Sequence, residues 1–281
     1  MSTIEKILVP VDYSPVSVRS YEYAIRLASE LSASVHLLHC LPSAGAVAAQ
    51  GNIVFDFSAG IQLEEDRRLD EFMTTVLKGV QSDLKAVPEV TCSTTSYGLG
   101  EAIVYQSEEK GVDLIVAGTH GITDGWDRLF GTNAAFLAAK AKSPILILPP
   151  GTSFTAPESI CVATSLKEED RKWGVYVADI FRPFRPSINF LHVCHPTEGQ
   201  SDEAIDLFRR VFEQPYDGLE ASFTSVYDED VTDGLFGYLE SSQHDMLVMM
   251  KTRRSWWNRL FEQSETKESA GKTSLPLLIL G

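Results

Sequence analysis

Short apolar runs alternate with amphipathic stretches along the first half of the chain. The apolar runs are rich in leucine and β-branched residues, which is typical of strands. They read "KILVPV", "SVHLLHCL", "VTCSTTSY", "DLIVAG" and "PILILP". The stretches between them place apolar residues three or four positions apart, as in "SVRSYEYAIRLASEL", and this spacing predicts helices with one buried side. The pattern therefore predicts strands and helices in regular alternation.

This alternation predicts the fold class. Strands that are apolar throughout are buried on both faces, and the helices between them cover both sides of a mainly parallel sheet. We therefore expect an α/β fold whose unit is a doubly wound, Rossmann-like sheet of five strands with helices on both faces. In such a sheet, ligands bind at the carboxyl ends of the strands.

The same pattern occurs twice in the chain. "KILVPVDYS" resembles "SICVATSLK", and "SVHLLHCLP" resembles "SINFLHVCHP", with both pairs separated by 153 residues. Further on, "DLIVAG" matches "DMLVMM", "WDRLF" matches "WNRLF" and "SPILILPPG" matches "LPLLILG", in the same order. The first copy ends near "LPPGTSFTAPE", whose composition is typical of a linker. The sequence therefore predicts two tandem domains, 1–153 and 154–281, each of ordinary size.

Charge and composition exclude several function classes. The formal net charge of −15 repels phosphate backbones and anionic lipids, so we expect neither a nucleic-acid partner nor a membrane partner. The segment "KTRRSWWNR" mixes cations with tryptophans that could stack on bases, but a loop packed onto the sheet is favoured. No apolar run reaches the roughly 20 residues of a membrane span, and no secretory signal is evident, which predicts a cytoplasmic protein.

The four cysteines lack the spacing of a metal site. They show no CxxC pair and mostly lie inside apolar runs, so we expect buried free thiols, with no zinc and no disulfide framework. No other group of residues suggests a metal site.

The segment "AGTHGITDGWDRLFGTNAAF" carries the clearest chemistry. Gly118 and Gly121 follow an apolar run, and Gly131 and Thr132 open a predicted helix. Glycines let backbone N–H groups approach a ligand closely, and a helix N-terminus attracts anions, so the spacing indicates a phosphate site. Tight turns are the structural alternative. Neither G-x-G-x-x-G nor G-x-x-x-x-G-K-[ST] is present, and "TKESAGKTS" precedes a strand and lacks the first glycine of the second motif.

Asp12 follows the first predicted strand and supplies a second candidate group. A carboxylate at this position could accept hydrogen bonds from ribose hydroxyls while the glycine amides hold phosphates. With Ser14 and Pro15 after it, Asp12 could equally form an N-cap and a turn.

Taken together, these residues resemble the universal stress proteins in their tandem form, and the resemblance covers essentially the whole chain. The family's ATP-binding pattern, G-x-x-G-x9-G-[ST], is met by Gly118, Gly121, Gly131 and Thr132. "KILVPVDYSPVSVRSYEYAIRLA" and "SPILILPP" are also similar to the family. The resemblance implies the adenine nucleotide alpha hydrolase-like variant of the fold, and ATP, with or without Mg²⁺, as the ligand.

The resemblance also implies a role for each matching residue. Asp12 would face the ribose, while the phosphates would be held from two sides, by the glycine turn and by the helix start. The adenine pocket would be lined by Pro10, Val11 and Cys40, the glycine turn would use Gly118, His120 and Gly121, and the helix start would use Gly131, Thr132, Asn133 and Ala134.

The second copy departs from this pattern. Ala163 and Ser165 stand in the places of Pro10 and Asp12, so the ribose acceptor is lost. "MMKTRRSWWNRLFEQSE" contains no glycine and puts Glu262, which would repel a phosphate, in the place of Gly131. We therefore expect ATP only in the first domain and a structural or regulatory second domain. The cations of this segment could attract a different anion, so another ligand of the second domain stays an open alternative.

Three functions are compatible with the sequence. The favoured one is a cytoplasmic ATP-binding protein with a stress-response or signalling role. The alternatives are a slow ATPase or a nucleotidyl- or phosphoryl-transfer enzyme on the same fold, and a structural module that has lost its ligand. His120, Asp124, Asp127 and Arg128 show no spacing that demands catalysis, so binding is favoured over turnover and no catalytic residue is assigned.

The assembly is predicted from the last apolar run of each copy. An exposed edge strand of this kind pairs with another strand, and the family resemblance implies an internal pseudo-dimer, with a homodimer also open. The inducing stress, the protein partner and the role of segment 43–62 are not decided by the sequence.

Overall fold

The computed structural model describes residues 3–41, 58–119, 141–196, 220–251 and 275–281, together with residues 205, 206, 209, 210 and 212. The chain divides into two compact units, one made mainly of Ile4–Gly118 and the other mainly of Leu146–Gly281. These units divide the chain by packing, whereas the predicted boundary after residue 153 divides it by sequence repeat, and that boundary stays a prediction.

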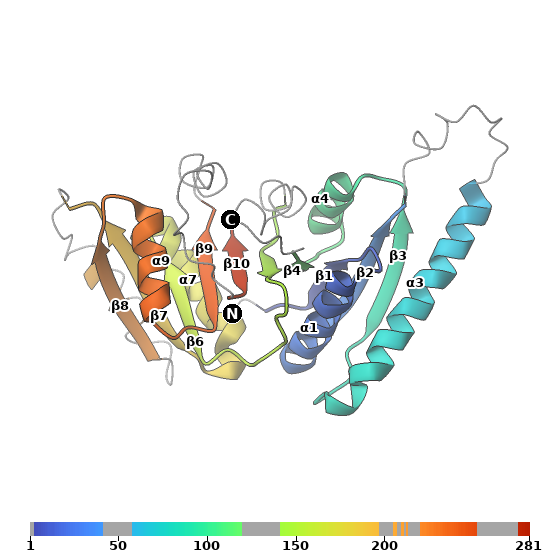
Figure 1. Ribbon diagram of the computed structural model, residues 1–281, viewed down its shortest axis with the longest axis horizontal. Helices are drawn as coiled ribbons and strands as arrows, with labels where there is room; N and C mark the ends of the chain where they lie inside the picture. The colour runs from blue at the N-terminus through green and yellow to red at the C-terminus, as the bar shows by residue number, and fades with distance from the viewer. Residues whose placement is uncertain are drawn as a thin grey trace. The chain divides into compact units, whose positions relative to one another are not determined.

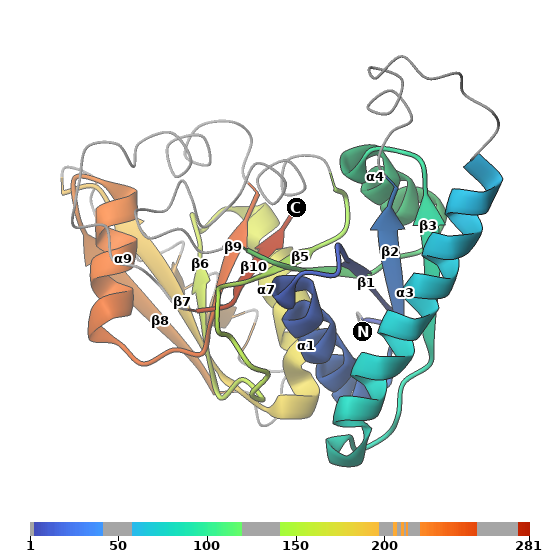
Figure 2. The same cartoon turned by 45° about the vertical axis from the view of Figure 1, so that its right-hand side comes forward.

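The first unit is a parallel sheet with the strand order β3-β2-β1-β4. Helices α1 and α3 pack against each other, and Figure 2 shows both in front of the strands. Because α4 connects β3 back past β1 to β4, a right-handed crossover places it on the opposite face. The elements are β1 (Lys6–Pro10), α1 (Pro15–Leu31), β2 (Ser34–Cys40), α3 (Ser58–Val80), η1 (Gln81–Asp83), β3 (Val90–Thr95), α4 (Leu99–Glu109) and β4 (Leu114–Gly118). Strand β5 (Ile145–Leu148) comes later in the chain, and from Leu146 onward its residues belong to the other unit.

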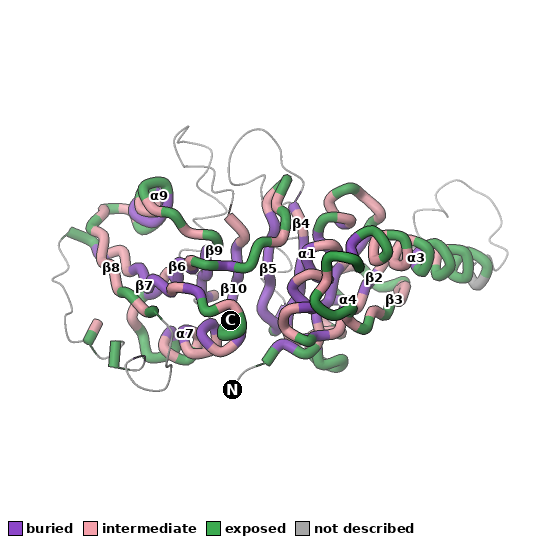
Figure 3. Tube along the Cα trace, turned by 90° about the horizontal axis from the view of Figure 1, so that it is seen from below, coloured by how far each residue is buried: buried purple, intermediate pink, exposed green. Residues whose placement is uncertain are grey.

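The second unit repeats this arrangement with the order β10-β9-β6-β7-β8, and its paired strands are again parallel. In Figure 3, α7 and α9 lie on opposite sides of the β6, β7 and β8 strands. The elements are β6 (Ser159–Ala163), α7 (Glu168–Phe181), η2 (Arg182–Phe184), β7 (Ser187–Cys194), β8 (Glu220–Tyr227), α9 (Val231–Ser241), β9 (Met246–Met250) and β10 (Leu277–Leu280). Figure 1 labels all of these except η2. The predicted fold class, a doubly wound α/β protein with mainly parallel strands, is confirmed.

Burial follows the sequence pattern. The central residues of β1, Ile7, Leu8 and Val9, are completely buried, and all five residues of β9 are buried as well. Helix α1 begins where the sequence offers an N-cap: the Ser14 Oγ accepts the Ser17 N–H at 3.2 Å, and Pro15 occupies the first turn. All four cysteines are free thiols, of which Cys161 and Cys194 are buried and the other two are half-buried.

The backbone turns that follow corresponding strands and helices are also repeated. Tyr13 and Leu166 both adopt positive φ, 63° and 60°, directly after the first strand of each unit. Ser32 and Arg185 do so after the first helical segment, with φ of 58° and 53°. Both pairs are 153 residues apart, the offset found in the sequence repeat. Residues other than glycine rarely adopt this conformation, so the shared positions reflect a shared chain path.

An aspartate anchors the amino end of each sheet. The Asp113 Oδ2 atom accepts the backbone N–H groups of Glu5 and Lys6, both at 2.9 Å. Asp245 makes the same pair of contacts at the start of β6, both at 2.8 Å. These carboxylates join the start of one strand to the chain that enters its neighbour, at the edge opposite to the expected ligand site. Their role in this structure is structural.

A polar contact joins β2 to β3 in the first unit, and an equivalent contact joins β7 to β8 in the second. The His36 ring lies between two hydroxyls of β3, with Nδ1 2.8 Å from the Thr91 Oγ1 and Nε2 2.9 Å from the Ser93 Oγ. In the second unit Asn189 takes this place, and its Nδ2 donates to two β8 hydroxyls at 2.8 and 2.9 Å. Burial, and after it the nearby charge of Lys6, lowers the pKa of His36 from 6.5 to about 4.

This contact predicts how stability depends on pH. Because the folded-state pKa of His36 is lowered, the unfolded chain takes up a proton between pH 6.5 and 4 that the folded chain does not. The free energy of unfolding therefore decreases as the pH is lowered through that window. The substitution His36→Asn should therefore reduce the loss of unfolding free energy between pH 7 and pH 4.5 by roughly 1 kcal/mol, since partial solvation weakens the effect. Urea unfolding at the two pH values measures it.

The reverse substitution, Asn189→His, serves as the matched control and should make the pH dependence steeper. Parallel pH profiles for His36→Asn and the unaltered protein would show that this histidine does not carry the effect.

Candidate functional site

The strands β1, β2 and β4 end at one edge of the first sheet. In register, Pro10 lies opposite Leu38, and Leu8 lies opposite Ile115. Continuing these registers brings Asp12 level with Cys40 and Val11 level with Gly118. The structure therefore places the described part of the predicted site, Pro10, Val11, Asp12, Cys40 and Gly118, at one carboxyl edge. The other predicted residues, His120, Gly121, Gly131, Thr132, Asn133 and Ala134, lie outside the described residues.

Asp12 forms a side-chain turn at the end of β1. Its Oδ1 accepts the Ser14 N–H at 3.0 Å, and its own N–H donates to the Ser17 Oγ at 3.4 Å. The N-cap of α1 is Ser14, so of the two structural roles that the sequence left open, Asp12 takes the turn and Ser14 takes the cap. The turn orients an exposed carboxylate at the sheet edge, where a ligand hydroxyl could donate to it.

The residues around Asp12 provide apolar surface and an inert thiol. Val11 is buried, and its N–H donates to the Leu38 carbonyl at 2.9 Å, which extends the β1–β2 ladder by one residue. Cys40 is half-buried, and burial raises the pKa of its thiol, so it is protonated at neutral pH. Cys40 can therefore line a site here but is not activated as a nucleophile.

Gly118 is required by packing, quite apart from any ligand. A Cβ atom at this position would lie 2.5 Å from the Ser20 Oγ and 2.5 Å from the Val16 Cγ1. Helix α1 thus approaches the end of β4 too closely for a side chain. The next residue, Thr119, is buried, and its N–H and Oγ1 both donate to the Leu148 carbonyl, at 3.0 and 3.3 Å. The start of the glycine segment is therefore held by the sheet itself.

The corresponding turn in the second unit is closed by a carboxylate of its own. The Asp170 Oδ2 accepts the Ser165 N–H at 2.7 Å, the Ser165 Oγ at 2.8 Å and the Thr164 Oγ1 at 3.0 Å. Asp170 is 3% exposed and stands in the place of Ser17. The second unit therefore has its carboxylate buried beneath the turn, where protein groups engage it, and a serine where the first unit has Asp12.

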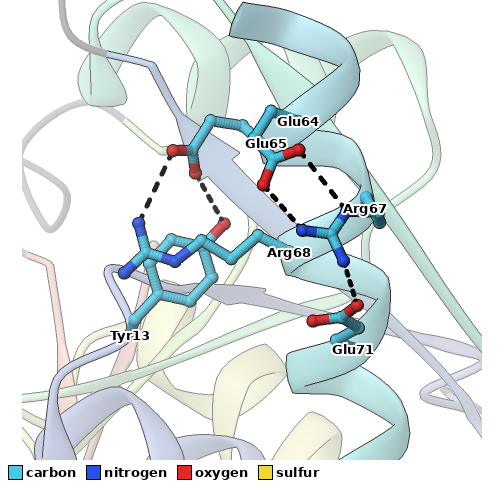
Figure 4. A network of polar contacts seen from close by, with 6 residues as sticks. All are labelled: Tyr13, Glu64, Glu65, Arg67, Arg68 and Glu71. Carbon is cyan, nitrogen blue, oxygen red and sulfur yellow. Dashed lines mark hydrogen bonds and ion pairs between the residues drawn. The ribbon is translucent and has the colours of Figure 1, made fainter.

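A cluster beside Asp12 was not predicted from the sequence. The Tyr13 OH donates to the Glu65 Oε2 at 3.2 Å, and the Arg68 guanidinium lies over the Tyr13 ring, 4.2 Å from its centroid (Figure 4). Burial, followed by the Glu65 charge, raises the pKa of Tyr13, so its hydroxyl stays protonated. Glu65 and Arg68 belong to α3, and nothing in the sequence pattern singled them out.

His39 connects this cluster to the end of β1. Its Nδ1 lies 2.8 Å from the Val11 carbonyl oxygen, which can only accept, so Nδ1 is the donor in this contact. The His39 ring centroid lies 4.6 Å from that of Tyr13. His192 makes the same contact with the Thr164 carbonyl at 2.8 Å in the second unit. The repeated "LH" in the sequence was the signal that could have identified this contact.

The strand order and the edge described above define an α/β protein with a Rossmann-like fold. The sequence model of the universal stress protein family matches residues 3–149, and the chain belongs to this family. The universal stress protein YxiE of Bacillus subtilis (strain 168) is 28% identical over 151 residues, which cover 51% of this chain and 97% of that protein.

Solved structures of similar proteins match nearly the whole chain. A universal stress protein from Archaeoglobus fulgidus DSM 4304 superposes with a TM-score of 0.67 at 12% identity, covering 99% of this chain and 96% of its own. A putative universal stress protein from Pseudomonas aeruginosa UCBPP-PA14 gives 0.59 at 12% identity, covering 99% and 93%. At this level of identity, the likeness concerns the fold.

Among the helices that the structure describes, none combines the length and the apolar composition of a membrane span.

The packing at Gly118 generates a prediction. Gly118→Ala should lower the free energy of unfolding by about 1–3 kcal/mol without any ligand, because the new methyl group overpacks the contact between α1 and β4. Adding Val16→Ala and Ser20→Ala should recover part of this loss. Denaturant unfolding of the ligand-free protein checks both statements.

Gly79→Ala is the control, because a Cβ there meets nothing within 4 Å and should leave stability unchanged or slightly higher. A Gly118→Ala variant as stable as the unaltered protein would contradict the close approach of α1.

Proposed function

We propose that the protein is an ATP-binding universal stress protein with a stress-response or signalling role, in which residues 1–153 hold the nucleotide. The observation that carries this proposal is the exposed Asp12 carboxylate, which its turn fixes at the same edge as the end of β4. From that end the chain continues into the family's ATP-binding pattern, beginning at Gly118. The family membership supports the proposal.

In this proposal each part of the nucleotide meets a different kind of group. The Asp12 carboxylate accepts hydrogen bonds from ribose hydroxyls, and the apolar surface of Pro10 and Val11 with the neutral Cys40 thiol takes the adenine ring. Backbone amides of the glycine segment and the helix start that follows hold the phosphates, and Mg²⁺ accompanies them. The described residues fit this assignment, because Asp12 is exposed and Cys40 is half-buried and protonated.

The second domain, 154–281, has a structural or regulatory role in this proposal. Its carboxylate at the strand end, Asp170, is buried and accepts three hydrogen bonds from the turn, and Ser165 cannot replace the charge of Asp12. The proposal includes the association that the family resemblance implies, an internal pseudo-dimer with a homodimer also open. The four free thiols support a reducing, cytoplasmic setting. The nucleotide acts as a bound signal rather than as a substrate in turnover.

Calorimetric titration of the full chain with ATP and Mg²⁺ tests the proposal. We expect one nucleotide per chain and a loss of affinity of about tenfold or more in Asp12→Ala, because a hydrogen bond to a charged group contributes about 1.5–3 kcal/mol. ATP should also raise the melting temperature of the unaltered protein by mass action.

Ser165→Ala alters the equivalent position of the second copy and should leave ATP affinity within about twofold. Two nucleotides per chain, or equal effects of the two substitutions, would contradict the assignment to the first domain, and no binding would overturn the proposed function.

A further inference from the structure

Tyr13 adopts a backbone conformation that tyrosine rarely takes. Its φ of 63° lies in the left-handed region, between the Asp12 turn and the Ser14 cap. Residues other than glycine keep such a conformation only where their surroundings hold it. Leu166 has the same conformation in the second unit, so the fold supports it without a hydroxyl. The polar contacts of the Tyr13 side chain are therefore an addition to the basic turn.

Helix α3 holds the Tyr13 side chain by a paired set of contacts. Glu65 accepts the Tyr13 hydroxyl at 3.2 Å with one carboxylate oxygen and lies 3.5 Å from the Arg68 guanidinium with the other. Arg68 in turn covers the ring of Tyr13 (Figure 4). A cation over an aromatic face is attractive, and the same guanidinium orients the carboxylate that binds the hydroxyl. The three side chains thus form a closed set of contacts.

Glu65 also lies near His39, which contacts the residue on the other side of Asp12. His39 donates from Nδ1 to the Val11 carbonyl, and its Nε2 lies 3.8 Å from the Glu65 Oε2. The side chains of His39 and Glu65 are only 13% and 21% exposed, which limits screening of their contacts by water. One carboxylate on α3 therefore binds Tyr13 directly and lies near the ring that contacts the Val11 carbonyl.

We propose that Tyr13 is a positioning residue for the Asp12 carboxylate, and that Glu65 of helix α3 sets ligand affinity at Asp12 through its hydrogen bond with Tyr13. This inference rests on the proposed nucleotide site. It makes the docking of α3 and the occupancy of the site interdependent, because a bound ribose and a docked α3 both favour the same geometry of the turn. Helix α3 is then the element through which occupancy of the site reaches the protein surface.

The sign of the effect separates positioning from simple charge. Removing the negative charge of Glu65 would weaken its Coulomb repulsion of an anionic nucleotide nearby, and this effect alone would strengthen nucleotide binding. Positioning predicts the opposite, because the turn loses the added support of the Tyr13 contacts. Tyr13→Phe makes the same prediction without any change of charge, since it removes only the hydroxyl that Glu65 accepts.

The experiment measures the affinity of the full chain for ATP with Mg²⁺ by calorimetry. We expect Tyr13→Phe and Glu65→Gln each to weaken binding about two- to tenfold, and the double variant to be no weaker than the worse single one, because both remove one interaction. Glu64→Gln is the matched control: it removes the same charge from the adjacent residue, which pairs with Arg67, and should stay within about twofold. Tighter binding by Glu65→Gln, or equal effects of Glu64→Gln and Glu65→Gln, would overturn the inference.

Amide hydrogen exchange of the ligand-free protein tests the turn independently of ATP. The Ser14 and Ser17 N–H groups, which donate to the Asp12 Oδ1 and the Ser14 Oγ, should exchange about two- to tenfold faster in Tyr13→Phe and Glu65→Gln. Unchanged exchange overturns the positioning role even if ATP binds. If the unaltered protein binds no ATP while exchange quickens, the proposed function fails, the support of the turn stands, and its link to nucleotide affinity is overturned.

Discussion

Burial of parallel strands on both faces is the constraint on which the structure depends. Helices cover both faces of each sheet, so the strand interiors are apolar and polar chemistry is confined mainly to the two strand ends. At the amino edge this leaves a structural requirement, which Asp113 and Asp245 meet by accepting the N–H groups that enter β1 and β6. At the carboxyl edge the same confinement collects Asp12, Cys40 and Gly118, which lie far apart in the sequence.

The two copies keep the scaffold and differ in what they place at the carboxyl edge. Asn189 takes over the bridging contact of His36, and His192 repeats the carbonyl contact of His39. These contacts are shared by the corresponding strands of the two copies. By contrast, the carboxylate moves from an exposed place at Asp12 to a buried one at Asp170, where three hydrogen bonds hold it. An exposed carboxylate can serve a ligand, whereas the buried one closes the turn.

Helix α3 contacts the turn that carries Asp12 in the first unit. Its covering of β3 is ordinary packing, but Glu65 and Arg68 extend it to the turn that carries Asp12. The surroundings hold this left-handed turn in both units, and in the first unit the contacts of Tyr13 with a neighbouring helix add to that support. In the second unit a leucine stands at this position, and a leucine side chain cannot form the hydrogen bond that Tyr13 forms.

The sequence by itself determined the fold class, the repeat and the family, because apolar periodicity and motif spacing are local properties of the chain. It also singled out Asp12 and Gly118 as site residues, which stays a prediction, and the structure adds a structural role for each. Asp12 forms a turn while Ser14 caps the helix, and Gly118 is explained by the approach of Val16 and Ser20 on α1.

Only the tertiary structure decided that Tyr13, His39 and Glu65 meet, since each comes from a different element and each is unremarkable in its own segment. Contacts of this kind depend on where a helix docks on a sheet, and that docking follows from side-chain packing over many residues rather than from any local pattern.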